Sequence, residues 1–313
     1  MKLCFLCNHV MALPALEYLV VNKEVVGIGV PNADNQATAH AQALAKHYGI
    51  AFQAFSAQQL EQNLPEWLTK IDAELAIVFT FPYRIPASVL EVPHHGFYNV
   101  HPGPLPAYRG PNPVFWQIAN SETLGGVTVH RMDAGLDTGP VVDYASVPLA
   151  SNDTYNLAVQ KLAKAAQERL AALVGVLPEL EGMPQKPTEP VNSSRPQRRT
   201  LMVDWKNKSA VQIDALIRAC NYDYGGAVTG FRGHMLRLLE SRIALEPGDT
   251  DNPAGTVLCA NSDRGLSIQC GDGSVLFLEI IQTESGCFSG RRFVEIAGIQ
   301  VGETMSMPYT DAG

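Results

Sequence analysis

Short apolar runs alternate with helix-like segments from Met1 to about Leu180, and this alternation constrains the fold most strongly. Buried strands are predicted at residues 3–6, 25–30, 51–55 and 75–80, and helices at residues 12–21, 38–48 and 60–71. Strands alternating with helices are typical of a parallel sheet with crossover helices. We therefore expect an α/β fold whose first domain is a Rossmann-like, mostly parallel sheet. Residues 7–11 after the first run lack G-x-G-x-x-G, so this topology does not imply a dinucleotide.

Three polar residues suited to acyl-group chemistry follow predicted strands. Asn99 and His101 stand two residues apart, so on an extended segment their side chains point to the same side. Asp137 follows further along the chain, flanked by Gly135 and Gly139. An amide can donate to a developing oxyanion, and an imidazole can exchange a proton near neutral pH. A carboxylate can fix the imidazole tautomer and favour its charged form.

Each of these residues also has an ordinary structural interpretation. Asn99 can form a turn, His101 can be a satisfied core residue, and Asp137 can cap a turn or a helix. Taken together these interpretations are weaker, because the segment after His101 concentrates residues with special backbone conformations. These residues are Pro102, Gly103, Pro104, Pro106 and Gly110. We therefore favour a shared polar site.

The segment from Asn99 to Gly139 resembles the folate-dependent formyltransferase family. This family includes methionyl-tRNA formyltransferase, sugar-nucleotide N-formyltransferases and glycinamide ribonucleotide formyltransferase. The resemblance rests on Asn-x-His-Pro-x-x-Leu-Pro-x-Tyr-Arg-Gly at residues 99–110 and on Leu-Asp-Thr-Gly at residues 136–139. It implies that Asn99, His101 and Asp137 are the catalytic residues. The chain departs from the family pattern at Gly103-Pro104, where Ser-Leu is usual, so the contact of a Ser hydroxyl is missing here.

The resemblance also implies binding roles for neighbouring segments. The loop at residues 81–86 follows a predicted strand, at the edge where ligands bind in open α/β sheets. In the family, the main chain of this loop grips the pterin of the folate. The implied cofactor-binding residues are Phe81, Tyr83, Arg84, Ile85, Pro86, Leu136 and Asp137. The implied substrate-binding residues are Tyr108, Arg109 and Gly110. The prolines of the loop can also end the strand and start a helix at residues 87–90, which is compatible with this role.

A stretch rich in Pro, Ser and Arg separates the first domain from the rest of the chain. A helix expected over residues 153–177 is the last large element of that domain. We predict a catalytic domain at residues 1–183, a linker at 184–200 and a second domain at 201–313. In the second domain, a helix at 210–220 and short β-runs at 235–239, 255–259, 266–270 and 275–281 predict a small OB-like barrel. The linker arginines 195, 198 and 199 are either solvated or a phosphate contact.

Composition limits the ligands and the compartment. A net charge of −8 argues against a general affinity for nucleic acid or anionic membranes. The sequence has no apolar run of membrane-spanning length and no signal-peptide pattern, so we expect a cytoplasmic location. Cys4 and Cys7 form a lone C-x-x-C without a second pair at zinc-site spacing. We therefore expect no metal site and interpret most of the six cysteines as core residues.

The charge distribution bears on the formyl acceptor. In the resembled tRNA enzymes, a basic insertion and a basic C-terminal domain grip phosphates. Residues 31–39 occupy the place of that insertion and contain no Lys or Arg. The predicted barrel contains the acids Glu246, Asp249, Asp251, Asp263, Asp272, Glu279 and Glu284. We expect a small amine acceptor, such as the amino sugar of a nucleotide sugar or an amino-acid-derived metabolite, and no nucleic-acid partner, with methionyl-tRNA as the alternative.

The expected reaction is attack of a primary amine on the formyl carbon of 10-formyltetrahydrofolate, without a covalent enzyme intermediate. Asn99 and a protonated His101 would donate hydrogen bonds to the developing oxyanion. Asp137 would pair with the imidazolium or hold a water that carries the amine proton. Two other classes stay open, a formyltetrahydrofolate hydrolase and a non-catalytic binding module. A homodimer is compatible with the sequence, because interface and core faces look alike in one chain.

Overall fold

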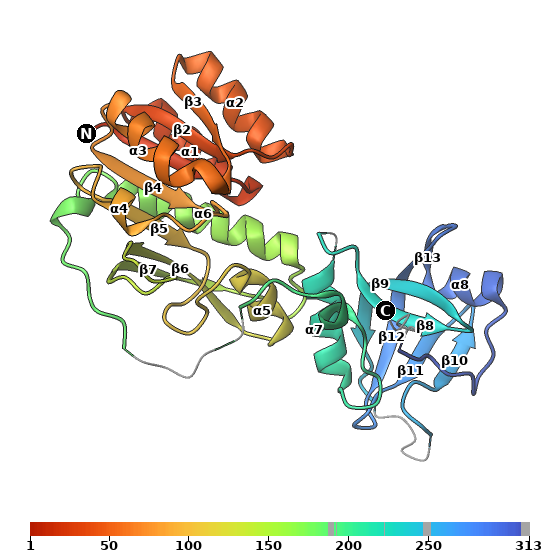
Figure 1. The fold of residues 1–313 in the computed structure, drawn as a ribbon. Coiled ribbons are helices and arrows are strands. Elements are labelled where there is room, and N and C mark those ends of the chain that lie inside the picture. The colour runs from red at the N-terminus through yellow and green to blue at the C-terminus, as the bar shows by residue number, and fades with distance from the viewer. Residues whose placement is uncertain (187–190, 192, 222, 247–251, 308–313) are drawn as a thin grey trace. The chain divides into compact units, whose positions relative to one another are not determined.

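The computed structural model describes residues 1–186, 191, 193–221, 223–246 and 252–307, which form two compact units (Figure 1). The first unit comprises residues 1–114, 124–148 and 159–194, and the second comprises 115–123, 149–158 and the described residues from 195 onward. The predicted limits at residues 183 and 200 stay a prediction. Within the predicted linker, residues 187–190 and 192 lie outside the described residues, as do the acids Asp249 and Asp251.

The first unit is built on a seven-stranded sheet in the order β3-β2-β1-β4-β5-β6-β7. Strands β1 to β5 are parallel, and β6 is antiparallel to both β5 and β7. The Rossmann-like fold class is confirmed, although β7 was not predicted, because its half-exposed residues form no apolar run. The strands are β1 (Leu3–Cys7), β2 (Val25–Pro31), β3 (Ala51–Phe55), β4 (Leu75–Phe79), β5 (Phe97–His101), β6 (Leu124–Arg131) and β7 (Val141–Pro148).

Helices lie close to the predicted places, and the largest difference in length is at α6 (Tyr155–Leu173). The helix expected over residues 153–177 is shorter at both ends. Oδ2 of Asp153 accepts from the Ala150 N–H at 2.8 Å in the preceding turn, and Gly175 and Pro178 follow its last residue. The helices are α1 (Leu13–Asn22), α2 (Gln36–Tyr48), α3 (Leu60–Lys70), α4 (Ala87–Leu90), α5 (Pro113–Ala119) and α6 (Tyr155–Leu173). The short turns are η1 (Val10–Ala12), η2 (Ala57–Gln59) and η3 (Leu177–Glu179).

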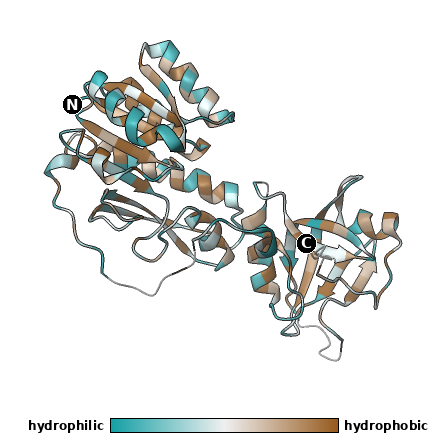
Figure 2. Cartoon of the chain, viewed as in Figure 1, coloured by the Kyte–Doolittle hydropathy of each residue, from teal (hydrophilic) through white to brown (hydrophobic). Residues whose placement is uncertain are grey.

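The core of the first unit lies between its central strands and the helices. Strands β1 and β4 are buried along their whole length, as their unbroken apolar runs predict (Figure 2). Helix α3 buries Leu64 and Trp67 against this sheet, and the Trp67 ring lies edge-on to Phe55, with ring centroids 5.4 Å apart. Such packing fixes the carboxyl ends of the strands, from which the loops of the site begin.

The cysteines of β1 belong to this core. Cys4 and Cys7 are fully buried, and burial raises the pKa of both thiols, that of Cys7 to about 12. Buried thiols of this kind are unreactive. Cys220 and Cys270 are buried as well, whereas Cys259 is half-buried and Cys287 is exposed. The core interpretation is therefore confirmed for four of the six cysteines.

Antiparallel strands form the sheet of the second unit, in the order β10-β11-β12-β9-β8, with β13 paired to β12. Thr304 bridges Thr256 beside β10, and Ser306 bridges Gly230 in β8, so one segment joins both edges of the sheet. This closure agrees with the predicted OB-like barrel. The elements are η4 (Arg198–Leu201), α7 (Ala210–Cys220), β8 (Ala227–Phe231), β9 (His234–Ile243), β10 (Val257–Asn261), β11 (Gly265–Gln269), β12 (Val275–Thr283), β13 (Gly286–Ser289) and α8 (Gly290–Ala297).

Two kinds of feature are absent from the described residues. None of the helices found there is both long enough and apolar enough to cross a membrane. Within the same part of the chain, no group of three or more His, Cys, Asp or Glu residues is arranged to hold a metal ion.

Candidate active site

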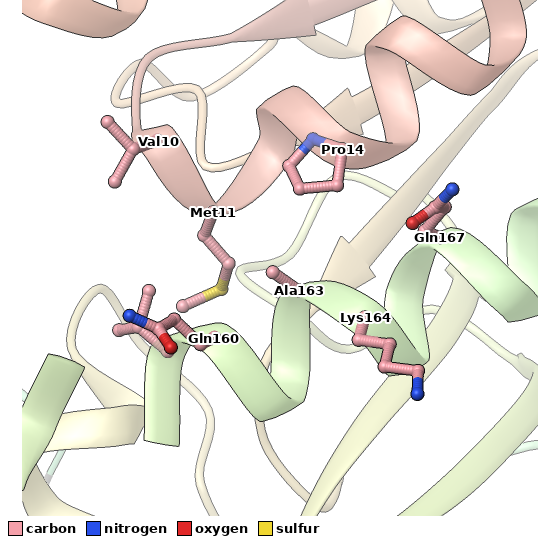
Figure 3. Close-up of a pocket in the computed structure, with 8 residues that line it drawn as sticks. Val10, Met11, Pro14, Gln160, Ala163, Lys164 and Gln167 are labelled. Atoms are coloured by element: carbon pink, nitrogen blue, oxygen red, sulfur yellow. The ribbon is translucent and has the colours of Figure 1, made fainter. Parts of the chain in front are cut away.

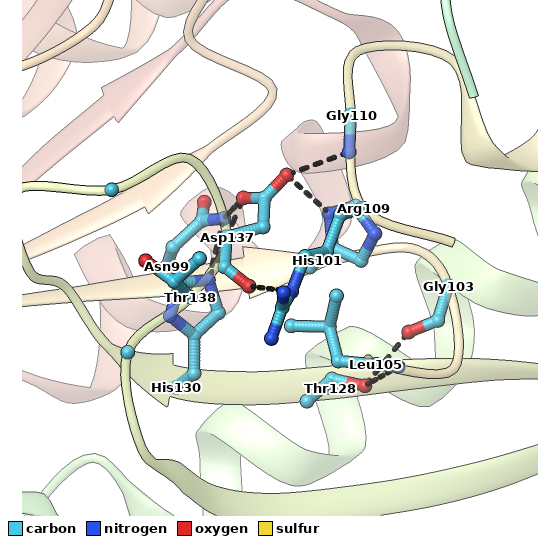
Figure 4. Close-up of polar contacts among 12 residues, drawn as sticks. Asn99, His101, Gly103, Leu105, Arg109, Gly110, Thr128, His130, Asp137 and Thr138 are labelled. Atoms are coloured by element: carbon cyan, nitrogen blue, oxygen red, sulfur yellow. Dashed lines mark hydrogen bonds and ion pairs between the residues drawn. The ribbon is translucent and has the colours of Figure 1, made fainter. Parts of the chain in front are cut away.

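The three residues predicted to be catalytic lie together at the carboxyl end of β5 (Figure 4). Asn99 and His101 alternate with Val100 along β5, so both side chains project from one face of the sheet. Asp137 lies in the loop between β6 and β7. Nδ2 of Asn99 donates to Oδ1 of Asp137 at 3.2 Å, and Nδ1 of His101 lies 3.6 Å from Oδ2. The fold thus assembles the predicted set, whose catalytic roles stay a prediction.

The loop that presents Asp137 is a tight turn that excludes larger residues at its glycines. Oδ1 of Asp133 accepts from the Gly135 N–H at 3.0 Å and from Oγ1 of Thr138 at 2.6 Å, which closes the turn. A Cβ at Gly139 would lie 1.8 Å from the Arg131 carbonyl oxygen. Asp137 itself has a φ of 54°, in the left-handed region that Asp tolerates better than most residues. The flanking glycines of the sequence therefore serve the turn.

A second histidine, His130, completes the polar cluster and was not predicted from the sequence. It lies opposite Asn99 in the β5–β6 pairing and is 2% exposed. Nδ2 of Asn99 donates to Nε2 of His130 at 3.1 Å, and Nδ1 of His130 donates to the Arg131 carbonyl at 3.2 Å. Because an amide nitrogen can only donate and a carbonyl oxygen can only accept, these contacts place the acceptor at Nε2 and the donor at Nδ1. The available signal was the period of two in Thr128-Val129-His130, which places Thr128 and His130 on the same face as Asn99 and His101.

His101 is held at both ring nitrogens. Its Nε2 lies 2.7 Å from the carbonyl oxygen of Tyr108, and because that oxygen can only accept, Nε2 carries a proton. Its Nδ1 faces the Asp137 carboxylate. Burial lowers the pKa of His101, although Asp137 acts in the opposite direction. Its burial, with 3% of the residue exposed, thus favours the neutral ring in the unliganded chain, while the protonated His101 expected during the reaction stays a prediction.

The Asp137 carboxylate is ionised. Burial raises its pKa, but His101, His130 and the N–H of Gly110 together outweigh that effect and lower it to about 2. The Gly110 N–H donates to Oδ2 at 2.9 Å, and Nε2 of His130 lies 3.6 Å from Oδ1. The cluster thus combines a buried anion with two imidazoles, and Nδ1 of His101 faces that anion.

The residues predicted to bind substrate make contacts within the site itself. The side chain of Tyr108 is buried, and its carbonyl accepts from His101. Nε of Arg109 donates to the Asp137 carbonyl at 3.1 Å and to Oε1 of Gln185 at 3.1 Å. Gly110 has a φ of 125° and donates to Asp137. Their assignment to substrate binding stays a prediction, while their observed contacts hold His101 and Asp137 in place.

Gly103, where the chain departs from the family pattern, lies against the His101 ring. A Cβ at this position would lie 2.9 Å from Cβ of Pro113, 3.0 Å from Nε2 of His101 and 3.2 Å from Cβ of Tyr108. The Gly103 carbonyl accepts from Oγ1 of Thr128 at 2.7 Å, which fixes the loop over the ring. Glycine therefore allows the close approach that seats Nε2 of His101 on the Tyr108 carbonyl.

The predicted folate loop follows β4 and adjoins the Asp137 loop. Phe81 and Ile85 are buried in the core cluster, so their side chains pack inside the unit and do not form part of its surface. The guanidinium of Arg84 donates to the Ala134 carbonyl, which ties the two loops together. Leu136 is 58% exposed beside Asp137, an apolar surface that suits the ring system of a folate. The structure thus brings these residues together, and their binding roles stay a prediction.

A shallow apolar groove of about 330 Å³ lies apart from this cluster, between the start of α1 and α6 (Figure 3). Its lining is mostly aliphatic, with polar side chains along the rim. The lining residues are Val10, Met11, Pro14, Val159, Gln160, Ala163, Lys164 and Gln167. None of them belongs to the polar cluster, so the groove adds no group to its chemistry.

Family models match both units of the chain. The model described as formyl transferase matches residues 20–174, and the model described as formyl transferase, C-terminal domain, matches residues 197–296. The chain belongs to the formyl transferase family. A methionyl-tRNA formyltransferase of Pelobacter propionicus is 34% identical over 69% of this chain and 66% of its own length. That of Thermosynechococcus vestitus is 30% identical over 75% of this chain and 74% of its own length.

Solved structures of formyltransferases share the fold of this family member at low sequence identity. The sugar 3N-formyl transferase WlaRD is 18% identical with a TM-score of 0.67, over 88% of this chain and 96% of its own. The N-formyltransferase from Helicobacter canadensis is 18% identical with a TM-score of 0.65, over 89% of this chain and 98% of its own. As a member of the formyl transferase family, the chain is a folate-dependent formyltransferase with 10-formyltetrahydrofolate as co-substrate.

Proposed function

We propose that this formyltransferase formylates the primary amine of a small molecule, such as an amino sugar of a nucleotide sugar or an amino-acid-derived metabolite. The observation that carries this proposal is the lack of cationic residues in the loop after β2. Residues 31–39 contain no Lys or Arg, and the whole chain has a net charge of −8. An acceptor with many phosphates needs several Lys or Arg contacts. A small acceptor needs few such cationic contacts.

Neutral polar groups at the ends of β1, β2 and β4 support the proposal. Nδ2 of Asn35 donates to Oδ1 of Asn8 at 2.9 Å, and Oγ1 of Thr80 accepts from the backbone N–H of His9 at 3.0 Å. Amides and hydroxyls of this kind suit the hydroxyl and amine groups of a sugar or amino acid. Arg84 and Arg109, which lie in the loops around the cluster, already donate to backbone carbonyls.

The proposed roles of the cluster follow from its contacts. The amine attacks the formyl carbon of the co-substrate, the bond between that carbon and N10 breaks, and N10 takes up the proton that the amine has lost, so that tetrahydrofolate leaves. The Asn99 amide is the partly exposed member of the cluster, and it would donate to the developing oxyanion by exchanging one of its two present acceptors, Asp137 or His130, for that oxygen. His101 offers its unprotonated Nδ1 to a proton released by the amine, and the resulting imidazolium would be stabilised by Asp137. His130 orients Asn99, since its Nε2 accepts from the Asn99 amide.

The acceptor can be identified by a turnover assay. Purified full-length chain would be incubated with 10-formyltetrahydrofolate and pools of amino sugars, nucleotide-linked amino sugars, amino acids or methionyl-tRNA, and tetrahydrofolate release would be measured. We expect release that depends on one small amine. Replacing Asn99 with Ala or His101 with Asn should then lower turnover by about 10²-fold. Near-normal turnover in either variant would remove that residue from the scheme.

Methionyl-tRNA is the second candidate, because the relatives with 34% and 30% identity described above are methionyl-tRNA formyltransferases. Release that depends only on methionyl-tRNA would establish it and overturn the charge argument. Release without any amine, with formate as product, would instead indicate a hydrolase. The expected cytoplasmic location and homodimer stay predictions.

A further inference from the structure

Gln185 makes four hydrogen bonds with the loops of the site, although it lies in the predicted linker. Its Nε2 donates to the carbonyl of Asp137 at 2.9 Å and to that of Gly139 at 2.8 Å. Its Oε1 accepts from Nε of Arg109 at 3.1 Å and from Nη2 at 2.7 Å. An amide side chain has two N–H donors and two oxygen lone pairs. Gln185 uses both N–H donors on the loop that contains Asp137 and both oxygen lone pairs on Arg109, in the loop after β5.

These contacts join segments that are far apart in the sequence. Asp137 and Gly139 belong to the loop between β6 and β7, and Arg109 belongs to the loop after β5. Nε of Arg109 also donates to the Asp137 carbonyl, so Gln185, Arg109 and Asp137 form a closed triangle of hydrogen bonds. Removing the side chain of Gln185 leaves the Asp137 carbonyl and the Arg109 guanidinium with fewer hydrogen-bond partners in a half-buried environment, which costs free energy of folding.

The triangle acts on the backbone of Asp137, which needs support. Asp137 has a φ of 54°, and a non-glycine residue in this region stays there only when its surroundings hold it. Its carboxylate contacts, to the amide of Asn99 and the N–H of Gly110, require this backbone conformation. Gln185 touches neither the carboxylate nor the imidazoles, so its effect on them passes through the Asp137 backbone.

The position of Gln185 in the chain is fixed independently. Met183 and Val141 exchange backbone hydrogen bonds, each of 2.8 Å, beside the start of β7. A Cβ at Gly182 would lie 2.8 Å from Cβ of Pro140, so glycine permits this approach. The segment is therefore anchored two residues before Gln185, and its amide reaches the site from a strand-like extension of the sheet edge.

We infer that Gln185 is a positioning residue, which holds the Asp137 loop and Arg109 so that the Asp137 carboxylate stays on Asn99, Gly110 and the two imidazoles. The inference rests on the proposed function only in so far as Asp137 is the group whose placement matters for catalysis. Misplacing a reacting group by about 1 Å can cost on the order of 10²-fold in rate. A role of this kind differs from simple anchoring of the segment, which would affect stability alone.

The test compares three variants of the full-length chain by NMR without ligand. Gln185→Ala removes all four contacts, whereas Gln185→Glu keeps an acceptor for Arg109 and loses both donors to the Asp137 loop. Lys186→Ala is the matched control, because Lys186 is an exposed neighbour in the same segment. Hydrogen exchange of the Gly110 amide reports the bond to Asp137, and the Arg109 Nε–H signal reports the bond to Oε1.

We expect Gly110 exchange to accelerate about 10-fold or more in both Gln185 variants and to stay within about twofold of the wild type in Lys186→Ala. The Arg109 Nε–H signal should be lost in Gln185→Ala and kept in Gln185→Glu. Unchanged Gly110 exchange in the folded Gln185→Ala variant would overturn the inference. If that variant does not fold, Gln185→Glu decides by the same criterion.

Kinetics separate this inference from the proposed function. In whichever reaction the wild type consumes 10-formyltetrahydrofolate, Gln185→Ala should lower kcat about 10-fold with little change in KM. The Gly110 exchange measurement needs no acceptor, so its outcome stands even if the acceptor differs from the one proposed. A loss of thermal stability with unchanged kcat and unchanged exchange would assign Gln185 to anchoring and would also overturn the inference.

Discussion

Two buried aspartates, one in each unit, differ in the chemistry of their neighbours. Asp214 in α7 accepts from Nε of Arg218 at 2.8 Å and from Oγ of Ser241 at 2.8 Å. Asp137 accepts from an amide and a backbone N–H and faces two imidazoles, with no guanidinium on its carboxylate. Both carboxyl groups are nearly inaccessible, with 7% of Asp214 and 9% of Asp137 exposed.

The difference shows that the partners of a buried carboxylate, rather than its burial, distinguish a structural pair from a candidate site. A guanidinium stays charged at every pH in use, so the Asp214 pair keeps a constant charge. An imidazole can gain or lose a proton near neutral pH, so the Asp137 cluster can change its charge during a reaction.

Replacing Asp137 with Asn should have the largest effect on activity. The substitution keeps the shape of the side chain and removes the anion that would stabilise a protonated His101. We expect turnover of 10-formyltetrahydrofolate to fall by about 10²-fold or more, measured by steady-state kinetics with the acceptor found in the assay above. Asp214→Asn is the control and should keep turnover per folded molecule. Equal losses in both variants would contradict the distinction.

Replacing Arg218 with Met should affect stability instead. The variant leaves the Asp214 carboxylate buried without its cation, and breaking a buried ion pair in this way costs about 3 kcal/mol. Arg218 also donates to the Asp153 carbonyl at 3.1 Å, a contact that is lost as well. Urea unfolding measures the free energy, and turnover of the folded fraction should not change. A variant as stable as the wild type but slower would reverse the assignment.

Replacing Gly103 with Ala should disturb the position of the His101 ring and so have a smaller effect on activity than the loss of the Asp137 anion. The added Cβ would lie 3.0 Å from Nε2 of His101, so the ring must shift and its bond to the Tyr108 carbonyl weakens. We expect a loss of about 1–3 kcal/mol in stability and roughly 10-fold in turnover. The control is Gly175→Ala, because a Cβ there meets nothing within 4 Å. If Gly103→Ala behaves like this control, the close approach has no functional meaning.

The pH dependence of unfolding should show the smallest effect. The pKa of His101 is lowered from 6.5, so its stabilising contribution is complete above about pH 6.5 and is lost as the pH falls below it. The pKa of Asp137 is lowered from 3.8 to about 2, so its contribution of about 2 kcal/mol is lost between roughly pH 4 and pH 2. Urea unfolding of the wild type and of His101→Asn between pH 7.5 and 5 measures the first step. Identical slopes in the two proteins would show that His101 does not contribute.

Sequence patterns predicted most of the first unit because its strands are continuously apolar. Leu75–Phe79 and Val25–Pro31 are buried strands of the central sheet and had no competing interpretation. The elements that were missed lack this signal. Strand β8 contains Gly230, and helix α8 begins with Gly290 directly after its N-cap Ser289, whose Oγ accepts from the Arg292 N–H. Tertiary contacts, rather than local pattern, decide such short elements.

At the candidate site, spacing and resemblance brought Asn99, His101 and Asp137 to attention, and their proximity is now observed. His130 was missed because one histidine in a β-branched run looks like an ordinary core residue. Gln185 was missed because nothing local distinguishes it from other polar residues of a Pro-rich stretch. The protonation state of His101 could not be read from the sequence either, since it depends on burial and on the Tyr108 carbonyl.

The contacts of Gln185 have a consequence for how this family member can be cut and recombined. A protein engineer who joined another module after residue 183 would keep Asn99, His101 and Asp137 yet discard the amide that bonds to the Asp137 loop. The first unit continues to Ser194, so a chimera joined there keeps every polar contact of Gln185. A domain boundary placed where the amino-acid composition changes can therefore cut off residues, such as Gln185, that support the active site of the domain.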